Sequence, residues 1–181
     1  MTERLITALN DVCTYLAEGE AWHMRVANQC RKLHIRGLGR WHEAEACGDF
    51  KHRECLEKLL MDNCKIETDI EPARIVDSMT TKFNGMSDFK QHFFTWAERE
   101  ELLISALSTA IDESRLENIE LYHKLCCIQK EVQNERMRAE WAYHRLDLAG
   151  WNGHDIGVVS MIIHSYFEKE YDGGLIDFNI G

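Results

Sequence analysis

The chain has 181 residues, with 21 lysines and arginines against 31 aspartates and glutamates, so its formal net charge is −10. This charge disfavours nucleic acid as a partner, because a phosphate backbone would meet net repulsion. No apolar run approaches the ~20 residues that cross a bilayer, and the first residues lack a basic segment followed by an apolar one. We therefore expect a cytoplasmic globular protein with one core and no membrane contact.

The chain contains one proline and seven cysteines. Because proline usually marks loops and strand edges, its scarcity predicts a few long helices. The cysteines form no Cys-x-x-Cys pair, and their odd number and scattered spacing favour reduced thiols over disulfides or a thiolate zinc site. They are Cys13, Cys30, Cys47, Cys55, Cys64, Cys126 and Cys127.

Apolar residues recur at steps of three and four in four segments of the chain. This pattern predicts helices at about residues 2–31, 38–63, 87–111 and 114–149. The connections after the first and third helices are short, whereas residues 64–86 form a long stretch without a sustained period. Connections in the order short, long, short are those of a four-helix bundle with one long crossover.

Each predicted bundle helix carries an acidic residue near its middle, on or beside its apolar face: Glu20, Asp49, Glu100 and Glu135. At a rise of ~1.5 Å per residue, an antiparallel bundle brings all four to one level of the core. Four converging carboxylates repel one another unless they are protonated or neutralised. A pair of divalent metal ions would neutralise them, and oxygen and imidazole donors favour iron or manganese over thiophilic metals.

Two histidines follow acidic residues at a spacing of three, in Glu20-x-x-His23 and Asp49-x-x-His52. This spacing places both donors on one helical face. Di-metal carboxylate bundles use a glutamate from each of two helices and a Glu-x-x-His pair from each of the other two. Singly, these are ordinary boundary or core side chains, so the prediction rests on their joint placement. The predicted metal site consists of Glu20, His23, Asp49, His52, Glu100 and Glu135.

Three short runs carry a resemblance to a known family. The Arg-Glu-Cys-Leu-Glu-Lys-Leu run at 53–59 is similar to the second-helix Arg-Glu-His-Ala-Glu-Lys-Leu run of ferritins. The Leu-Asn-Asp run at 9–11, followed by Glu-Gly-Glu at 18–20, resembles the first helix of small bacterial ferritin-like proteins. The Trp-Ala-Glu-Arg-Glu-Glu run at 96–101 follows the crossover, where the family carries its third-helix glutamate. The chain thus resembles the ferritin-like superfamily over about residues 3–149.

The resemblance implies an all-α, ferritin-like four-helix bundle at residues 1–150, with one long crossover. Residues 151–181 would add a short C-terminal fifth helix and a tail that pack on the bundle or on a neighbouring subunit. The resemblance also implies a di-iron centre that oxidises ferrous iron with oxygen or peroxide, which is a ferroxidase-type reaction, in a homo-oligomer. Manganese is the alternative metal.

The resemblance also assigns roles to the predicted ligands. Glu20 and Glu100 would be terminal ligands, Asp49 or Glu135 would bridge the metals, and an imidazole from His52, with His23, would complete the shell.

The sequence departs from the family pattern at three places. In the ferritin alignment, His52 and Cys55 stand where the family has its second-helix glutamate and histidine, so the motif needs a shift of one turn, to Asp49 and His52. Arg138 stands where the resemblance would place a fourth-helix histidine, and arginine does not ligate metals. On the third helix, Glu98 and Glu101 compete with Glu100 for the inward position.

Two alternatives stay open. The first is a metal-free ferritin-like bundle whose polar centre is a salt-bridge cluster around Arg138, and which acts as a structural or protein-interaction module. The second is a di-iron oxygenase of an organic substrate, which requires an open pocket beside the metals. Metal content separates the first alternative from an iron site.

Overall fold

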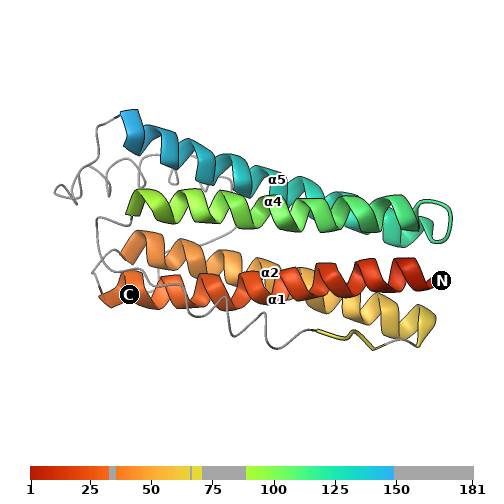
Figure 1. Cartoon of the computed structure of the whole chain (residues 1–181). Helices are drawn as coiled ribbons and strands as arrows, with labels where there is room; N and C mark the ends of the chain where they lie inside the picture. Colours follow the sequence, from red (N-terminus) through yellow and green to blue (C-terminus); the bar gives the residue numbers. More distant parts are fainter. Residues whose placement is uncertain (33–35, 66, 71–88, 149–181) are drawn as a thin grey trace.

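Four long α-helices make up the part of the chain that the computed structural model describes, which is residues 1–32, 36–65, 67–70 and 89–148 (Figure 1). No strand occurs among these residues. The all-α, four-helix prediction is therefore confirmed, whereas the expected fifth helix and tail at 151–181 lie outside the described residues. The helices are α1 (Glu3–Lys32), α2 (Arg36–Cys64), α4 (Phe89–Ser114) and α5 (Ile119–Leu148).

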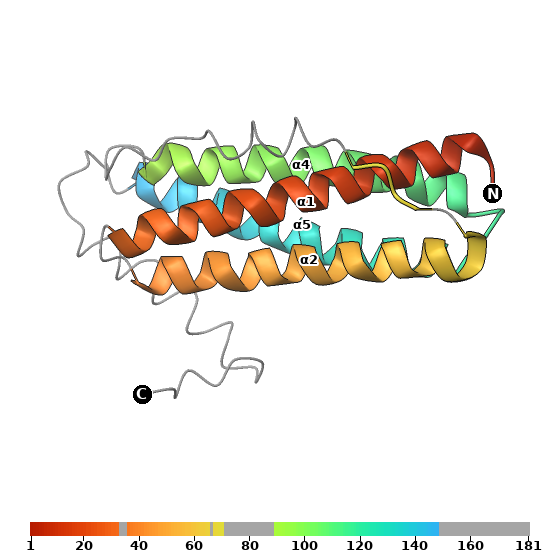
Figure 2. The ribbon, with the colours of Figure 1, turned by 90° about the horizontal axis from the view of Figure 1, so that it is seen from below.

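The helices form two antiparallel hairpins, α1/α2 and α4/α5, and α1 packs against α4 (Figure 2). α2 ends at the end of the bundle where α1 begins, whereas α4 begins at the opposite end (Figure 1). The end of α2 and the start of α4 therefore lie at opposite ends of the bundle, which is the arrangement that the predicted long crossover requires. Backbone approach between α2 and α5 is much sparser than within either hairpin.

The ends of the helices have identifiable causes. The Thr2 hydroxyl accepts a hydrogen bond from the Leu5 amide at 3.3 Å, and the Asn118 side chain accepts one from the Leu121 amide at 3.0 Å. Both are N-cap contacts that satisfy free amide groups of a first turn. Just after the C-terminal end of α2, Lys65 adopts a positive φ of 57°, and this left-handed conformation ends the helix.

The predicted boundary between the third and fourth helices is wrong by about one turn. A connection was expected at 112–113, with the last helix starting at Ser114, but α4 continues to Ser114 and α5 begins at Ile119. The Ser114 carbonyl accepts hydrogen bonds from the amides of Glu117 and Asn118, which form a closing turn. Asn118 therefore caps the start of α5, and Ser114, where the helix was predicted to start, is the last residue of α4.

Apolar side chains fill the bundle in two separate clusters, one toward each end. The cluster near the start of α4 is built around Trp22, Trp41, Phe93 and Trp96. The other is built from leucine, isoleucine and valine, with residues such as Leu16, Leu56, Leu103 and Val132. On every helix an acidic residue lies between the positions that belong to the two clusters. The polar level of the bundle is therefore in its middle, as the sequence predicts.

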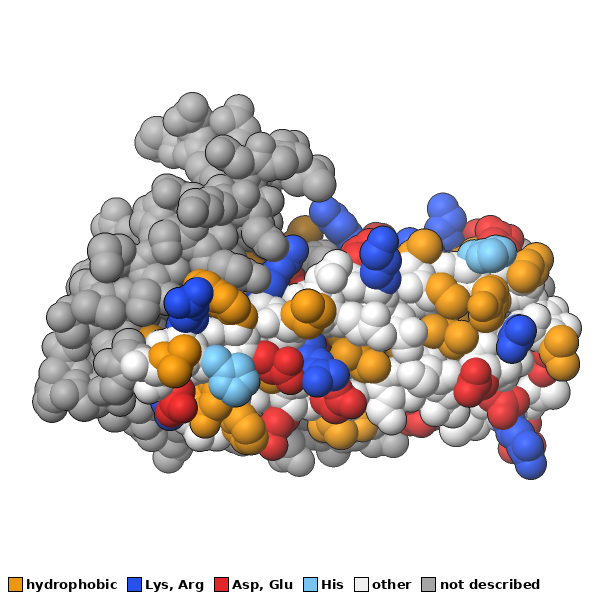
Figure 3. Space-filling model, turned by 90° about the horizontal axis from the view of Figure 1, so that it is seen from above, with side chains coloured by type: hydrophobic (Ala, Val, Ile, Leu, Met, Phe, Trp, Pro, Cys, Tyr) orange, Lys and Arg blue, Asp and Glu red, His pale blue; other side chains and the backbone are white. Residues whose placement is uncertain are grey.

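The outer face of the molecule mixes acidic and basic side chains with small apolar patches (Figure 3). None of the described helices is long and apolar enough to cross a membrane. The six cysteines whose side chains the structure describes are unpaired, in agreement with the reduced-thiol prediction: Cys13, Cys30, Cys47, Cys55, Cys126 and Cys127.

Candidate functional site

Five acidic side chains from the four helices gather at the polar level of the bundle. α2 contributes Glu45 and Asp49, whose spacing of four residues places them on one face. Asp49 and Glu100 are each 6% exposed, and Glu45 is 7% exposed. α5 contributes Glu135, and α1 contributes the buried Glu18. We call these five residues the acid cluster.

Burial and mutual repulsion raise the pKa values of three members of the cluster, Asp49, Glu100 and Glu135. Burial raises the pKa of Glu100 to about 8, and the nearby Glu45 adds to the effect. The pKa of Asp49 is raised well above its usual range by burial and then by the charges of Glu100 and Glu45. The pKa of Glu135 is raised by burial and then by Glu45 and Glu100. The cluster is therefore short of positive charge, because buried carboxylates stay ionised only beside a compensating cation.

Two tryptophans orient two of the acids. Trp41 Nε1 donates a hydrogen bond to Glu45 Oε1 at 2.5 Å, and Trp96 Nε1 donates one to Glu100 Oε1 at 2.9 Å. In both pairs the tryptophan precedes the acid by four residues on the same helix. The two indole rings also contact each other, with centroids 4.1 Å apart. Each carboxylate thus keeps one oxygen fixed by an indole and the other directed elsewhere.

Three buried histidines form a chain of hydrogen bonds beside the acid cluster. His23 Nδ1 lies 2.7 Å from His42 Nδ1, and His42 Nε2 lies 3.0 Å from His92 Nε2. Burial lowers the pKa of His92 to about 3, and it also lowers the pKa values of His23 and His42. All three are therefore neutral near pH 7. A neutral imidazole has one N–H, so His42 donates to one neighbour and accepts from the other.

The end of the histidine chain approaches the acid cluster. His23 Nε2 lies 3.8 Å from Glu100 Oε1. The chain cannot hold one metal ion with all three imidazoles, because His42 uses a different nitrogen toward each neighbour. Trp22 covers the chain: its ring stacks on His92 at 5.0 Å with planes 10° apart and meets the ring of His23 edge-on. The same indole carries the Arg99 guanidinium 5.3 Å from its centroid.

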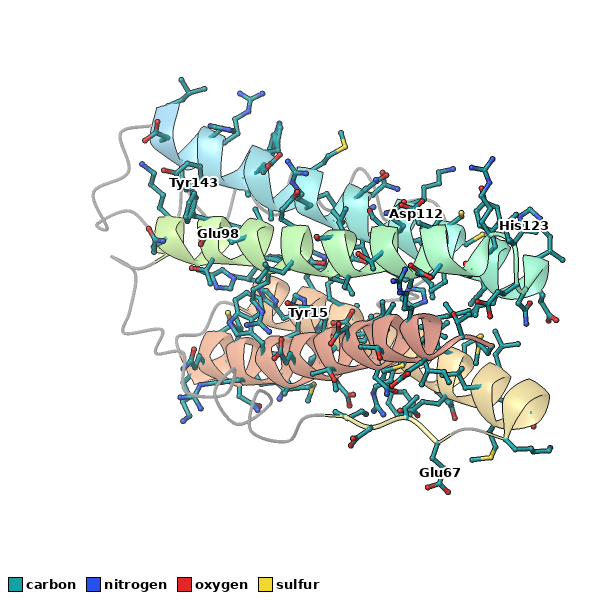
Figure 4. All side chains as sticks on the ribbon, turned by 45° about the vertical axis from the view of Figure 1, so that its right-hand side comes forward. Tyr15, Glu67, Glu98, Asp112, His123 and Tyr143 are labelled. Atoms are coloured by element: carbon teal, nitrogen blue, oxygen red, sulfur yellow. The ribbon has the colours of Figure 1, made fainter. Side chains whose placement is uncertain are left out.

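A small pocket leads from the surface to the acid cluster between α1 and α4. Its volume is about 30 Å³, which accommodates a water molecule or a small ion. Figure 4 marks Tyr15, one of its lining residues, on the side of α1 turned toward α4. The pocket is lined by Tyr15, Glu18, Gly19, Asp49, Arg99, Glu100, Leu102 and Leu103.

Gly19 allows Asp49 to approach α1 closely. A methyl group at Gly19 would overlap the Asp49 carboxylate, because its carbon would lie 3.1 Å from Asp49 Cγ and closer still to Oδ2. By contrast, a methyl group at Gly48 would meet nothing within 4 Å. The missing side chain on α1 thus makes room for the carboxylate of α2.

The structure brings together three of the six predicted ligands. Asp49, Glu100 and Glu135 belong to the acid cluster, where their charges act on one another. His23 contacts Glu100 but is also bonded to His42. On α4, Glu100 is the inward acid, since Glu98 is exposed and Glu101 forms an ion pair with Arg136 on the surface.

The remaining two predicted ligands have other partners. The Glu20 carboxylate accepts a hydrogen bond from Arg53 at 3.0 Å. His52 Nε2 lies 3.0 Å from a carboxylate oxygen of Glu131 on α5. The positively charged guanidinium of Arg99 lowers the pKa values of Asp49 and Glu100.

Sequence reasoning missed several residues of the site: Glu18, Glu45, His42, His92 and Trp41 as the orienting donor. One signal was available for two of them. The pattern Trp-x-x-x-Glu occurs twice, at 41–45 and 96–100, and at helical spacing it places an indole N–H beside a carboxylate. The histidine chain has no such signal, because its members come from three helices.

The donor set fits a hard divalent cation. The acid cluster supplies oxygen donors, and Asp49, Glu100 and Glu135 have raised pKa values although the Arg99 charge lowers those of Asp49 and Glu100. No three histidine, cysteine or acidic side chains in the described ranges surround one point closely enough to hold an ion as they stand. Binding would therefore need rotation of the acidic side chains.

Comparison with solved structures identifies the fold. The open-pore ferritin of the hyperthermophilic archaeon Archaeoglobus fulgidus superposes with a TM-score of 0.70 at 12% identity, covering 90% of this chain and 96% of that one. Chlorobium tepidum ferritin gives a TM-score of 0.66 at 9% identity over 97% and 99% of the two chains. An engineered closed form of the Archaeoglobus ferritin gives 0.69 at 12% identity over 98% and 99%.

No family model and no curated protein sequence matches this chain. The chain has the ferritin-like fold, as its resemblance to that superfamily predicts.

Proposed function

We propose that this chain binds ferrous iron at the acid cluster and oxidises it with oxygen or peroxide. The observation that carries the proposal is the group of three carboxylates with raised pKa values, Asp49, Glu100 and Glu135, of which the Arg99 guanidinium offsets the first two in part. Buried charge of one sign is costly, and a divalent cation would relieve that cost while taking oxygen ligands. The ferritins to which the fold is similar support iron as the cation.

In this proposal the first ligands are Asp49, Glu100 and Glu135, with Glu45 as a fourth acid. Two iron ions per chain would use the four carboxylates as shared or terminal ligands, and His23 is the imidazole next to Glu100. Glu20 and His52 would join only by leaving Arg53 and Glu131. Bound ferrous iron would supply electrons to the oxidant, and the chain's part is to hold the ions close together in a buried site.

The dimensions of the pocket bear on the organic-substrate alternative. A volume of about 30 Å³ admits a water-sized species beside Asp49 and Glu100. An organic substrate needs roughly ten times that space, so we propose iron itself as the substrate. Manganese would suit the same oxygen donors. We also propose a homo-oligomer, which light scattering coupled to size exclusion would test.

Metal loading tests the proposal. Untagged protein would be loaded anaerobically with ferrous iron, desalted and analysed for metal, and its near-ultraviolet absorption followed after air is admitted. We expect about two irons per chain and a ferric absorption band that grows on oxidation. Glu135→Gln should lower the bound iron, whereas Glu54→Gln, on the exposed face of α2, should not.

Failure of the wild-type chain to retain iron, together with an unfolding temperature that ignores added metal, would refute the proposal. The remaining proposal would then be a metal-free bundle that acts as a structural or protein-interaction module, and its partners would be sought by affinity capture.

A further inference from the structure

The pocket at Gly19 opens from the surface onto the acid cluster between α1 and α4. Leu102, at its rim, is 53% exposed, whereas Asp49 and Glu100, at its floor, are each 6% exposed. Along the bundle axis the cluster is covered, because the histidine chain and the tryptophans lie toward one end of the bundle and the leucine-rich core lies toward the other. On the α5 side, Glu135 is half-buried.

A buried carboxylate lies at the floor of this pocket. Asp49 lines the pocket, and it has neither a hydrogen bond nor an ion pair with any residue in the described ranges. Its acidic neighbours Glu45 and Glu100 each hold an indole N–H. A buried carboxylate that faces a water-sized space without a donor is a ready ligand for a cation that enters that space.

The charges around the pocket favour a cation. Three acids line it, Glu18, Asp49 and Glu100, against one guanidinium, that of Arg99. The guanidinium lies over the Trp22 ring, which fixes it to one side of the pocket. A site lined mainly by one sign of charge and walled by apolar side chains concentrates ions of the opposite sign.

We propose that the Gly19 pocket is the port through which a divalent cation reaches the acid cluster, with Asp49 as the first ligand that it meets. This inference rests on the proposed function, because it assumes that the cluster takes a cation. Gly19 is the gate of the port: any side chain there would displace the Asp49 carboxylate and fill the space in front of it. Leu102 and Tyr15 form the rim and touch the ion only in passage.

A gate and a ligand have different kinetic effects, which makes the port testable. Closing a route raises the barrier for both entering and leaving, so association and dissociation slow together and the dissociation constant is unchanged. Losing a ligand instead weakens the bound state. Rim substitutions at Leu102 therefore report on the route alone, whereas Gly19→Ala changes the gate and the position of the Asp49 carboxylate together.

The experiment measures cobalt(II) and anaerobic iron(II) binding by stopped-flow quenching of tryptophan emission, since Trp41 and Trp96 bond directly to the acids. We expect Gly19→Ala to slow association by about tenfold or more. Gly48→Ala is the matched control, because it adds the same methyl group to a helix where nothing lies within 4 Å. It should bind at the wild-type rate.

The rim variants are expected to act in opposite directions. Leu102→Phe should slow association and dissociation by about the same factor, roughly threefold, and Leu102→Ala should accelerate both. The dissociation constant should stay within about twofold of the wild-type value in each. Leu116→Ala, at a residue that is 96% exposed beyond the end of α4, is the control and should change neither rate.

The outcomes separate the port from the proposed function. Wild-type association rates in both Gly19→Ala and Leu102→Phe, with full metal content, would overturn the port and leave iron binding intact. Weaker binding in Gly19→Ala with unaltered rates in the Leu102 variants would also overturn it, since Gly19 would then only position Asp49. A wild-type chain that binds no cation would overturn both proposals.

Discussion

The indole of Trp96 donates its only hydrogen bond to Glu100, at 2.9 Å, from the preceding turn of the same helix. This bond favours the ionised carboxylate and so opposes burial, which raises the pKa of Glu100 to about 8. Among the acids of the cluster, Glu100 is therefore held in place by a neutral donor that does not compete for a metal.

Replacing this donor should raise the pKa of Glu100 further. In Trp96→Phe the carboxylate loses a hydrogen bond, so its protonated form gains relative stability. The side-chain carboxyl resonance of Glu100 would be followed by NMR as a function of pH in protein labelled at glutamate. Trp141→Phe on α5 should leave that titration unchanged. A Glu100 pKa that stays at its wild-type value in Trp96→Phe would show that the indole only fills space.

The metal-free protein should be most stable at mildly acidic pH. Glu100 has its pKa raised from 4.5 to about 8 in the folded state, so its contribution is complete below pH 4.5 and is lost as pH rises through 8. His92 has its pKa lowered from 6.5 to about 3, so its contribution is complete above pH 6.5 and is lost as pH falls toward 3. The unfolding temperature should therefore be highest between about pH 4.5 and pH 6.5, where the losses from Glu100 and His92 offset each other.

A divalent cation should remove the alkaline part of this dependence. Above pH 6.5 the metal-free protein should lose stability because the acids ionise, and we expect the unfolding temperature to fall by several degrees, ~3 °C or more, by pH 8.5. Added manganese should restore it, and Glu135→Gln should flatten the slope without metal. Scanning calorimetry across the pH range provides the measurement, and a stability that rises steadily from pH 6.5 to 8.5 would contradict the raised acid pKa values.

Removing the middle histidine should strand its two neighbours. In His42→Leu, the ring nitrogens of His23 and His92 that now face His42 lose their partner inside the core. Each unsatisfied buried group costs about 1–3 kcal/mol, so urea unfolding should show a loss of roughly 2–5 kcal/mol. His42→Gln keeps one donor and one acceptor and should lose less. His144→Leu, at an exposed position of α5, should change stability by less than about 0.5 kcal/mol.

The cysteines should react with thiol reagents in an order set by burial. Burial raises the pKa of both Cys13 and Cys30 to about 12, so neither presents a thiolate near neutral pH. Cys47 and Cys127 are exposed. Brief treatment with iodoacetamide followed by peptide mass spectrometry should label the exposed pair first and the buried pair only after unfolding. Early labelling of Cys13 would mean that the leucine-rich cluster to which it belongs opens readily.

The fold could be predicted from the sequence because its signals are local. The period of apolar residues marks helices wherever one face is buried, and connection lengths then select the bundle topology. The failure at 112–118 has a local cause too, since Ser114 and Asn118 are both plausible caps and only the hydrogen bonds distinguish them. Both residues stand next to apolar positions, so the apolar period alone does not decide whether the last helix begins at Ser114 or at Asn118.

The site was predictable only in part, because convergence is a property of several helices. The convergence of Glu100, Asp49 and Glu135 at one level of the bundle can be predicted because each interrupts an apolar stripe, whereas their role as metal ligands stays a prediction. Glu20 satisfied the same criterion, yet it lies at the edge of its stripe, where the long Arg53 side chain reaches it. Glu18 is two residues away, about 200° around the helix, and is the acid of α1 that lines the pocket.

The sparse backbone contact between α2 and α5 gives the bundle one weak seam. Ionisable side chains meet there: Glu45 and Glu135 interact within the acid cluster, and His52 pairs with Glu131. Local opening should therefore begin at this seam, where the two backbones approach least closely and acids of like charge meet. Backbone amides of α2 and α5 beside the seam should exchange hydrogen faster as the acids ionise. The amides of α1 and α4 at the same level of the bundle should remain protected.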